Sequence, residues 1–219
     1  MVIGITGGIG TGKSTILRIL KEKYNFTIFE ADKIAHELMM KGNVSYLKIV
    51  DYFGNDILDE NNEIDRKKLG QKVFNDKKQL EKLNEFVHPE VIHEIQNRIE
   101  KIENNSIIEK ELNSKKDSKD KKDLQMEFAC KNNRFVIEAA LLFESGCNTI
   151  CDKVWYIDTK SEIRKQRLKE SRNMTDEQIE SVMKNQLDKE QFEGLADIVI
   201  DNSDSIESTE KQIQNILEF

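Results

Sequence analysis

The residues with the clearest chemical potential stand near the start of the chain. The run Gly7-Gly8-Ile9-Gly10-Thr11-Gly12-Lys13-Ser14 fits the pattern G-x-x-x-x-G-K-[ST] in full. Glycines in such a loop let backbone N–H groups turn inward around phosphate oxygens, and a helix that begins there presents its positive end to the same anion. We expect Lys13 to reach the β- and γ-phosphates and the Ser14 hydroxyl to bind Mg²⁺. The run therefore predicts a nucleotide phosphate-binding loop (P-loop).

Several alternatives to this interpretation have to be weighed. A glycine-rich turn without a ligand leaves Lys13 unexplained, because a cation at a helix start opposes the helix dipole. Nucleotide binding alone also leaves a GTPase switch, an ATP-driven motor and a small-molecule or nucleotide kinase as candidates. Asp51-Tyr52-Phe53-Gly54 fits D-x-x-G, but it ends an apolar stripe and indicates a helix that stops at Gly54. The N-K-x-D pattern that reads guanine does not occur, and the short chain favours a kinase over a motor.

Two carboxylates follow the second apolar run, in the order Phe29-Glu30-Ala31-Asp32. Ligands bind at the carboxyl ends of parallel strands, and a kinase needs a group that helps remove the proton of its acceptor hydroxyl. Asp32 or Glu30 could face that acceptor. Asp32 could equally be the N-cap of the helix that carries Ile34, and the residues alone leave both roles open.

A third candidate group is basic. Residues 161–171 form a helical pattern in which Arg164 and Arg167 are three apart and so share a face, and Arg172 follows closely. Such a helix after the fourth strand suits a lid that closes over transferring phosphates. A solvated, charged helix face is the alternative.

The elements that must position these residues follow from the apolar pattern. Five short apolar runs are predicted strands: Val2–Thr6, Phe26–Glu30, Arg134–Glu138, Lys153–Asp158 and Asp197–Asp201. Because helical patterns separate them and the runs are continuously apolar, we expect an α/β fold with a parallel sheet covered on both faces. Pro89 is expected in the first turn of a helix, and Thr175 with Gln178 predicts a capping box.

The segment between the second and third strands is too long for a simple crossover. Residues 33–101 contain several helical patterns and are predicted to form an inserted lobe. Residues 103–132 are predicted to be a charged insertion, because Glu109–Glu127 carries six Lys and six acidic residues and little apolar surface. A mobile excursion or a solvated helix extension is expected there, and a partner-binding surface is the alternative.

Composition sets further limits. The 219 residues suit one domain with an inserted lobe, and 34 basic against 41 acidic residues give a net charge of −7, which disfavours nucleic acid and membrane surfaces. No apolar stretch approaches the roughly 20 residues of a membrane span, and MVIGIT does not resemble a signal peptide. We therefore expect a cytoplasmic protein. Its three cysteines, Cys130, Cys147 and Cys151, are expected to be reduced thiols and not zinc ligands.

Taken in order, the motifs resemble those of the dephospho-coenzyme A kinase family. The resemblance covers nearly the whole chain outside residues 102–133. The segments that carry it are TGGIGTGKST, EADKIAHEL, Gly42, VDYFGNDIL, residues 64–69, Val73-Phe74, Val87-His88-Pro89, Leu141-Leu142-Phe143-Glu144, Gln186 and ADIVIDN. Each segment is weak alone, and their joint order is specific.

The resemblance implies a single three-layer P-loop kinase domain with a five-stranded parallel sheet, an acceptor-binding lobe at 33–101 and a lid at 161–190. It implies transfer of the ATP γ-phosphate to the 3′-hydroxyl of dephospho-CoA, with Mg²⁺, in a monomer that binds no nucleic acid or membrane. The implied ATP site is Gly8, Ile9, Gly10, Thr11, Gly12, Lys13, Ser14, Thr15 and, near the adenine, Asn202. Asp32 would be the general base and Arg167 the lid arginine.

The implied acceptor site is Asp32, Arg66, His88 and Leu141. Two simpler roles stay open: Arg66 could pair with an acid in the first turn of a helix, and His88 could fix the turn into the Pro89 helix.

The sequence departs from the family pattern at four places. Glu30 replaces the first Asp of D-A-D, Ala140 replaces a usual Pro, Glu138 stands near a usual Asp, and Ser171 followed by Arg172 leaves the second lid arginine undetermined. A related nucleoside or nucleotide kinase is the alternative enzyme. A nucleotide-dependent interaction module that uses Glu109–Glu127 is the alternative from another class.

Overall fold

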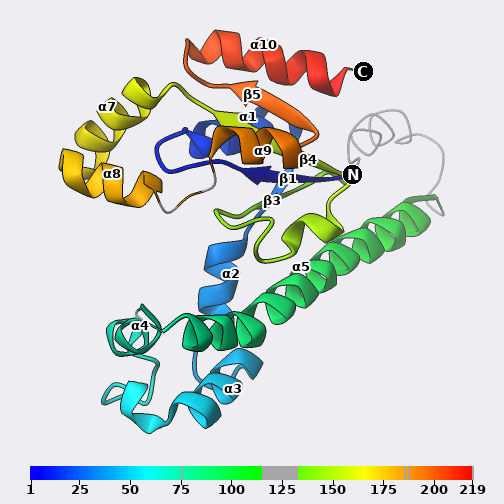
Figure 1. The fold of residues 1–219 in the computed structure, drawn as a ribbon. Coiled ribbons are helices and arrows are strands. Elements are labelled where there is room, and N and C mark those ends of the chain that lie inside the picture. The colour runs from blue at the N-terminus through cyan, green and yellow to red at the C-terminus, as the bar shows by residue number, and fades with distance from the viewer. Residues whose placement is uncertain (75, 115–132, 185, 187, 219) are drawn as a thin grey trace. The chain divides into compact units, whose positions relative to one another are not determined.

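The structure is a computed structural model that describes residues 1–74, 76–114, 133–184, 186 and 188–218 (Figure 1). The chain forms two compact units. The sheet unit contains Met1–Ile28 and the described parts of Lys122–Leu142 and Cys151–Phe219. The helical unit contains the described part of Phe29–Lys121 together with Phe143–Ile150.

The sheet has five strands in the order β2-β3-β1-β4-β5. These are β1 (Val2–Thr6), β2 (Thr27–Glu30), β3 (Phe135–Glu138), β4 (Lys153–Asp158) and β5 (Ile198–Asp201). The pairs β1–β3, β1–β4 and β4–β5 are parallel, with Ile5 opposite Glu138 and Trp155. The predicted five-stranded parallel sheet is thus confirmed, and three of its strands begin one residue later than predicted. β1 lies in the middle of the order, so the loop that follows it emerges at the centre of the sheet's carboxyl edge.

Helices of the sheet unit cover both faces of the central strands. They are α1 (Lys13–Tyr24), α7 (Ser161–Arg172), α8 (Asp176–Lys184), α9 (Lys189–Leu195) and α10 (Ile206–Leu217). Trp155 of β4 is buried in one core cluster with Ile16 of α1 and Ile213 of α10. The next residue, Tyr156, points to the opposite face, where its ring stacks on Phe192 of α9 with centroids 4.6 Å apart. This alternation explains why the strand is continuously apolar.

Helices also form the core of the helical unit. They are α2 (Ala31–Leu38), α3 (Val44–Phe53), α4 (Arg66–Phe74) and α5 (Lys77–Ser114), with short 3₁₀ turns at η1 (Asn55–Ile57) and η2 (Cys147–Ile150). α2, α3 and α4 each pack against α5. Ile34, Ile49 and Ile95 are at most 2% exposed in this core. As predicted, α3 ends at Gly54, whose N–H donates to the Val50 carbonyl, so the D-x-x-G match lies on a helix.

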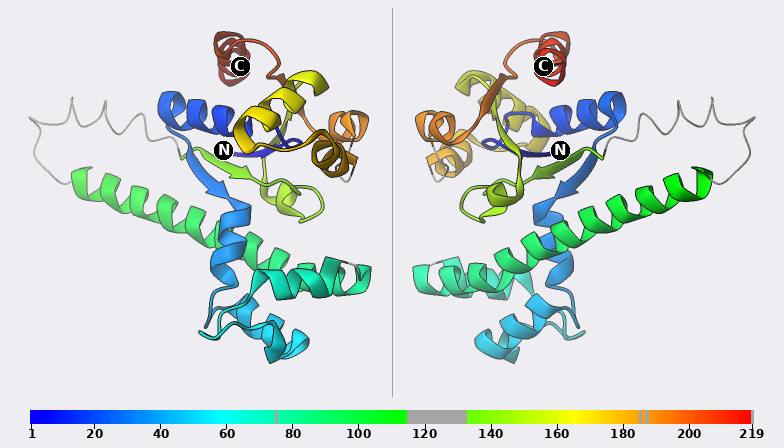
Figure 2. Two further views of the ribbon diagram at one scale, coloured as in Figure 1. Left: turned by 90° about the vertical axis from the view of Figure 1, so that its left-hand side faces the viewer. Right: turned by 90° about the vertical axis from the view of Figure 1, so that its right-hand side faces the viewer.

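The prediction for Pro89 is wrong. Pro89 lies inside α5 and not in a first turn. It lacks the N–H that would bond the Glu85 carbonyl, and the ribbon of α5 bends in its first half (Figure 2). Tertiary packing keeps the helix continuous, because Val87 and Val91 on either side of the proline are both buried. The Ser45 hydroxyl also donates to the Phe86 carbonyl at 3.1 Å.

α5 continues through residues 103–114 of the predicted charged insertion. This part is therefore a helix extension, which was one of the two structures predicted for it. The rest of that insertion, residues 115–132, lies outside the described residues. In the part of the chain that the structure describes, no helix combines the length and the apolar character needed to cross a membrane.

Candidate active site

The P-loop lies between β1 and α1, as the sequence predicts. Gly10 and Gly12 have φ values of 79° and 83°, which residues with a Cβ rarely adopt. A Cβ on Gly12 would also run into the Asn202 side-chain amide. No side chain caps the start of α1, so its first N–H groups stay directed at the loop. The loop therefore combines backbone donors with the positive end of a helix.

Lys13 is the first residue of α1, and its ammonium lies at the loop. Its Nζ donates to the Gly7 carbonyl at 2.7 Å and lies 3.9 Å from the carboxylate of Glu138, at the end of β3. The Lys13 and Glu138 side chains are only 17% and 15% exposed. The pair satisfies the requirement that a largely buried charge has an opposite charge nearby.

The other side of the loop is held through the Thr11 carbonyl. It accepts from Asn202 Nδ2 at 2.8 Å, from the Thr159 hydroxyl at 3.0 Å and from Arg167 Nη1 at 3.5 Å. The Asn202 Oδ1 accepts in turn from the Thr209 hydroxyl at 3.0 Å. The Asn202 side chain is thus occupied in bracing the loop, and its contact with adenine stays a prediction.

Arg164 and Arg167 both reach the P-loop from α7. Arg164 Nε donates to the Ile9 carbonyl at 3.0 Å, and Arg167 Nη2 donates to the Asn202 carbonyl at 3.0 Å. Their predicted common face is confirmed, and the solvated-face alternative is wrong for these two residues. The predicted capping box is also present, since Thr175 N–H donates to Gln178 Oε1 at 3.0 Å and Gln178 N–H to the Thr175 hydroxyl at 3.3 Å.

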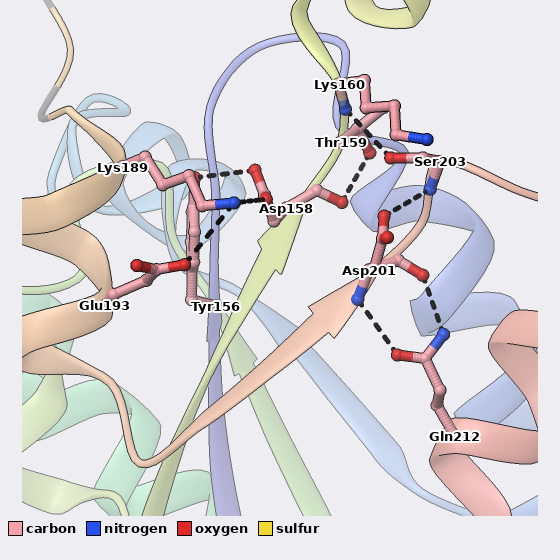
Figure 3. Close-up of polar contacts among 9 residues, drawn as sticks. All are labelled: Tyr156, Asp158, Thr159, Lys160, Lys189, Glu193, Asp201, Ser203 and Gln212. Carbon is pink, nitrogen blue, oxygen red and sulfur yellow. Dashed lines mark hydrogen bonds and ion pairs between the residues drawn. The ribbon is translucent and has the colours of Figure 1, made fainter.

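A polar network joins the end of β4 to α9 (Figure 3). Lys189 of α9 forms ion pairs with Asp158 at 2.7 Å and with Glu193 at 3.5 Å. The Tyr156 hydroxyl donates to Asp158 Oδ1 at 3.3 Å. Burial and the negative charge of Asp158 raise the pKa of Tyr156 to about 12. Tyr156 therefore stays a neutral donor at physiological pH, and the network fixes α9 at the carboxyl edge of the sheet.

A second network fixes the loop after β5 (Figure 3). Gln212 of α10 bonds both backbone groups of Asp201, at 3.1 Å to its N–H and 2.9 Å to its carbonyl. The Asp201 carboxylate accepts from Ser203 N–H at 2.9 Å, and bonds from Ser203 lower the pKa of Asp201. The Ser203 hydroxyl accepts from Lys160 N–H at 3.0 Å. These contacts hold the backbone on both sides of Asn202. The sequence does not indicate the Lys160–Ser203 bond, whose partners are 43 residues apart.

In the helical unit, Asp32 is the second residue of α2 and its side chain is exposed. The N-cap position belongs to Glu30, so the N-cap alternative for Asp32 is wrong. Glu30 Oε1 pairs with Lys33 Nζ at 2.7 Å. The Asp32 charge also contributes, after burial, to raising the pKa of the Cys147 thiol. Asp32 is therefore an accessible carboxylate in a first helical turn, where negative charge is favourable.

His88 and Arg66 occupy different parts of the helical unit. His88 is half-buried in the middle of α5, which rules out a role in a turn before a helix. Burial lowers the pKa of His88, and the nearby Glu144 charge opposes that shift. Arg66 is exposed at the start of α4, whose first N–H groups are capped by Asp65 at 2.8 and 3.3 Å. Within the described ranges Arg66 makes no ion pair, so the pairing alternative is not supported.

A cavity of about 440 Å³ opens beside Arg66, within the helical unit. Its walls are mainly apolar, with polar groups from three residues. The lining residues are His36, Met39, Met40, Glu63, Ile64, Arg66, Leu69, Gly70, Val73 and Leu83. Asp32 and His88 do not line it, and Leu141 is 53% exposed on the sheet unit. Of the predicted acceptor residues, Arg66 is thus the one that lines this cavity.

The oxygen groups around the P-loop suit a small divalent cation. Ser14 lies in the first turn of α1 with an exposed side chain, and the Glu138 carboxylate lies beside Lys13. Mg²⁺ binds hydroxyl, carboxylate, phosphate and water oxygens. The residues present therefore fit Mg²⁺ as the partner of a bound triphosphate.

Comparisons with known proteins agree with this site. A family model described as dephospho-CoA kinase matches residues 1–112 and 118–208. The dephospho-CoA kinase of Carboxydothermus hydrogenoformans is 36% identical over 217 residues, covering 99% of this chain and 93% of that protein. That of Fusobacterium nucleatum subsp. nucleatum is 37% identical over 218 residues, covering 100% and 97%.

A solved structure extends the comparison to three dimensions. The dephospho-CoA kinase from Campylobacter jejuni superposes with a TM-score of 0.63 at 28% identity, covering 99% of this chain and 97% of that one. Sequence and fold thus agree over almost the whole length. The chain belongs to the dephospho-CoA kinase family.

Proposed function

We infer that this protein transfers the γ-phosphate of ATP to the 3′-hydroxyl of dephospho-CoA and so completes coenzyme A synthesis. The observation that carries this inference is the family match across residues 1–112 and 118–208, which includes the P-loop with Lys13 and Ser14. In the reaction, a bond forms between the 3′-oxygen and the γ-phosphorus. The bond from the γ-phosphorus to the β-phosphate oxygen breaks, and ADP leaves.

At the phosphate end, we propose that the loop Gly8–Thr15 surrounds the ATP phosphates with its backbone N–H groups, apart from that of Ile9, which donates to Gln186 Oε1. Lys13 would exchange its bond to the Gly7 carbonyl for bonds to the β- and γ-phosphates. Ser14 would hold Mg²⁺, with Glu138 acting through water, and the ion would neutralise phosphate charge. Arg167 would stabilise the charge of the transferring group, since its guanidinium already lies at the loop.

At the acceptor end, we propose Asp32 as the general base that receives the 3′-hydroxyl proton. Two observations support this role. The Asp32 carboxylate is exposed, so an acceptor hydroxyl can reach it, and it is not the N-cap of α2, so no capping bond occupies it. The 440 Å³ cavity would take part of the dephospho-CoA acceptor, with Arg66 bonding an acceptor phosphate at its rim. His88 and Leu141 stay predicted acceptor residues.

The test is an ADP-release assay with MgATP, with and without dephospho-CoA, followed by mass analysis of the acceptor. We expect one added phosphate on dephospho-CoA and none on AMP or nucleosides. Asp32→Asn should lower kcat by ~10²–10⁴-fold and leave ATP affinity unchanged, because only proton removal is affected. Asp51→Asn, the same change at an exposed site on α3, is the control.

Either of two results would contradict these assignments. A product phosphorylated elsewhere, or no product despite ATP binding, would overturn the acceptor. Near-normal turnover of Asp32→Asn would remove Asp32 from the base role and leave the overall reaction intact. A cytoplasmic location and a monomeric state stay predictions, and gel filtration with fractionation of cells would test both.

A further inference from the structure

The Ile9 peptide, in the middle of the P-loop, is bonded on both sides by side chains from distant segments. Ile9 N–H donates to Gln186 Oε1 at 3.0 Å, and the Ile9 carbonyl accepts from Arg164 Nε at 3.0 Å. Arg164 Nη2 also donates to the same Gln186 oxygen at 3.2 Å. Three residues therefore form a closed ring of hydrogen bonds, in which Gln186 uses both acceptor positions of its carbonyl oxygen.

The loop sequence makes room for this ring. Gly8 lies directly beneath the two side chains, and a Cβ there would overlap Arg164 Nη2 and lie 2.8 Å from Gln186 Oε1. Arg164 is half-buried, and burial lowers its pKa, while Tyr156 and the Asp158 charge oppose that shift. A guanidinium stays protonated under such conditions, so the ring contains charge-assisted bonds that are stronger than neutral ones.

The ring also joins two other segments of the chain to the loop. Arg164 comes from α7, and Gln186 lies between α8 and α9. α9 is fixed to β4 by the Lys189–Asp158 pair and by the Tyr156–Phe192 stack. The Ile9 peptide is thus held against the rigid carboxyl edge of the sheet, through contacts inside the sheet unit alone.

We propose that Arg164 and Gln186 are positioning residues for phosphoryl transfer: together they fix the Ile9 peptide and thereby the direction of the loop N–H groups around the γ-phosphate. The proposal rests on the proposed function of the P-loop. Because a misdirected donor costs more in the transition state than in ground-state binding, the pair acts mainly on kcat. Arg164 is then the second arginine of α7 that serves the reaction.

Arg172 is the rival for that role. It stands exposed at the end of α7, and among the described residues it contacts no part of the P-loop. Ser171 does not take part either, since its hydroxyl donates to the Arg167 carbonyl at 2.6 Å. The geometry therefore favours Arg164, about two turns earlier in the helix.

Two matched pairs of variants test the proposal. Arg164→Lys is compared with Arg172→Lys, because a lysine keeps the positive charge but lacks the rigid guanidinium fork whose Nε bonds Ile9 and whose Nη2 bonds Gln186. Gln186→Leu is compared with Gln166→Leu, an exposed glutamine on α7 that bonds only Glu170 among the described residues. We expect Arg164→Lys and Gln186→Leu to lower kcat roughly 10- to 100-fold, the effect of losing bonds to a charged group.

Further readouts separate positioning from a structural role. KM for dephospho-CoA and the melting temperature, within about 3 °C, should stay as in the wild type. Gln186→Glu keeps both acceptor positions and should restore most of the activity that Gln186→Leu loses. The double variant Arg164→Lys/Gln186→Leu should lose little more than the worse single variant, because both act through one peptide.

The outcomes distinguish this proposal from the proposed function. Wild-type protein that does not phosphorylate dephospho-CoA would overturn the function itself. An active wild type with equal effects of Arg164→Lys and Arg172→Lys, or with fully additive losses in the double variant, would overturn the positioning pair alone. A fall in melting temperature with unchanged kcat would also overturn it.

Discussion

Lys13 lies at a position that is unfavourable for the stability of α1 and favourable for binding phosphate. It is a cation at the first position of α1, where the helix dipole is unfavourable for positive charge. The Gly7 carbonyl at 2.7 Å and the Glu138 carboxylate at 3.9 Å compensate for this cost in the absence of a nucleotide. Such an arrangement holds a positive charge ready at a loop built for phosphate.

Lys13→Ala should therefore reduce kcat/KM for ATP by ~10²–10³-fold, the usual effect of removing one preorganised electrostatic contact. Stability should also fall, because the largely buried Glu138 carboxylate loses its ion pair with Lys13, and the loss of an unfavourable charge at the helix start offsets part of this effect. Steady-state kinetics and thermal unfolding measure both quantities. Lys21→Ala, in the last turn of the same helix, is the control. Wild-type activity of Lys13→Ala would refute the P-loop assignment.

His88 gives a pH dependence whose sign follows from its burial. Its pKa in the folded protein is lowered from the ordinary value of about 6.5, so the unfolded chain takes up a proton first as the pH falls. The contribution of His88 to stability is thus present above about pH 6.5 and is lost as the pH falls below it. We expect His88→Gln to lose less stability than the wild type between about pH 7 and pH 5.

Glu144 provides the matched comparison for this prediction. Its charge raises the pKa of His88 against the effect of burial, so Glu144→Gln should lower that pKa further. The loss of stability with falling pH should then be larger than in the wild type. Urea unfolding at a series of pH values measures both differences, and parallel profiles for all three proteins would contradict the role of His88.

At the scale of elements, α5 is the part of the molecule that local sequence preferences describe least well. A proline inside a helix costs about 3 kcal/mol relative to alanine, yet α5 continues from Lys77 to Ser114 through Pro89. Its buried face, including Val87, Val91 and Ile95, is contacted by three other helices. Tertiary packing of an apolar face commonly contributes more to helix stability than propensity does.

Pro89→Ala should accordingly raise the free energy of unfolding of the helical unit by about 1–3 kcal/mol, because an N–H for the Glu85 carbonyl is restored. Pro89 is the only proline in the sequence and is exposed, so the shorter side chain leaves no buried cavity. Urea unfolding followed by circular dichroism measures the change. A less stable variant would mean that the packing around α5 requires the bend.

At the scale of the whole molecule, the two units carry separate cores and separate parts of the proposed site. The P-loop, Arg164 and Arg167 belong to the sheet unit, while Asp32, Arg66 and His88 belong to the helical unit. The single tryptophan, Trp155, is 1% exposed in the core of the sheet unit. Its fluorescence therefore reports on the unit that contains the proposed ATP site.

MgATP at 100 times its dissociation constant should stabilise the sheet unit by about 2.7 kcal/mol, because the nucleotide binds only the folded loop. The Trp155 unfolding transition should move to higher urea by the corresponding amount. Lys13→Ala should show a much smaller shift at the same MgATP concentration. An equal shift in both proteins would indicate that the stabilising nucleotide binds away from the P-loop.

Local patterns in the sequence were sufficient for much of this description. The P-loop, the positions of the five strands, the Thr175 capping box and the end of α3 at Gly54 depend on neighbouring residues only. The family resemblance also follows from the order of short segments. These features could be predicted because glycine-rich turns, caps and continuous apolar runs each specify their structure within a few residues.

The tertiary structure decided the contacts between distant segments and the exceptions to local rules. Gln186 bonds Ile9 from 177 residues away, and Asn202 bonds Thr11 from 191 residues away. The sequence around Gln186 and Asn202 does not indicate either partner. Packing likewise placed Pro89 inside a helix and Asp32 two residues beyond the N-cap of α2. Differences in helix propensity contribute from tenths of a kcal/mol to about 3 kcal/mol per residue. Burial of the apolar face of a whole helix contributes more free energy than these differences.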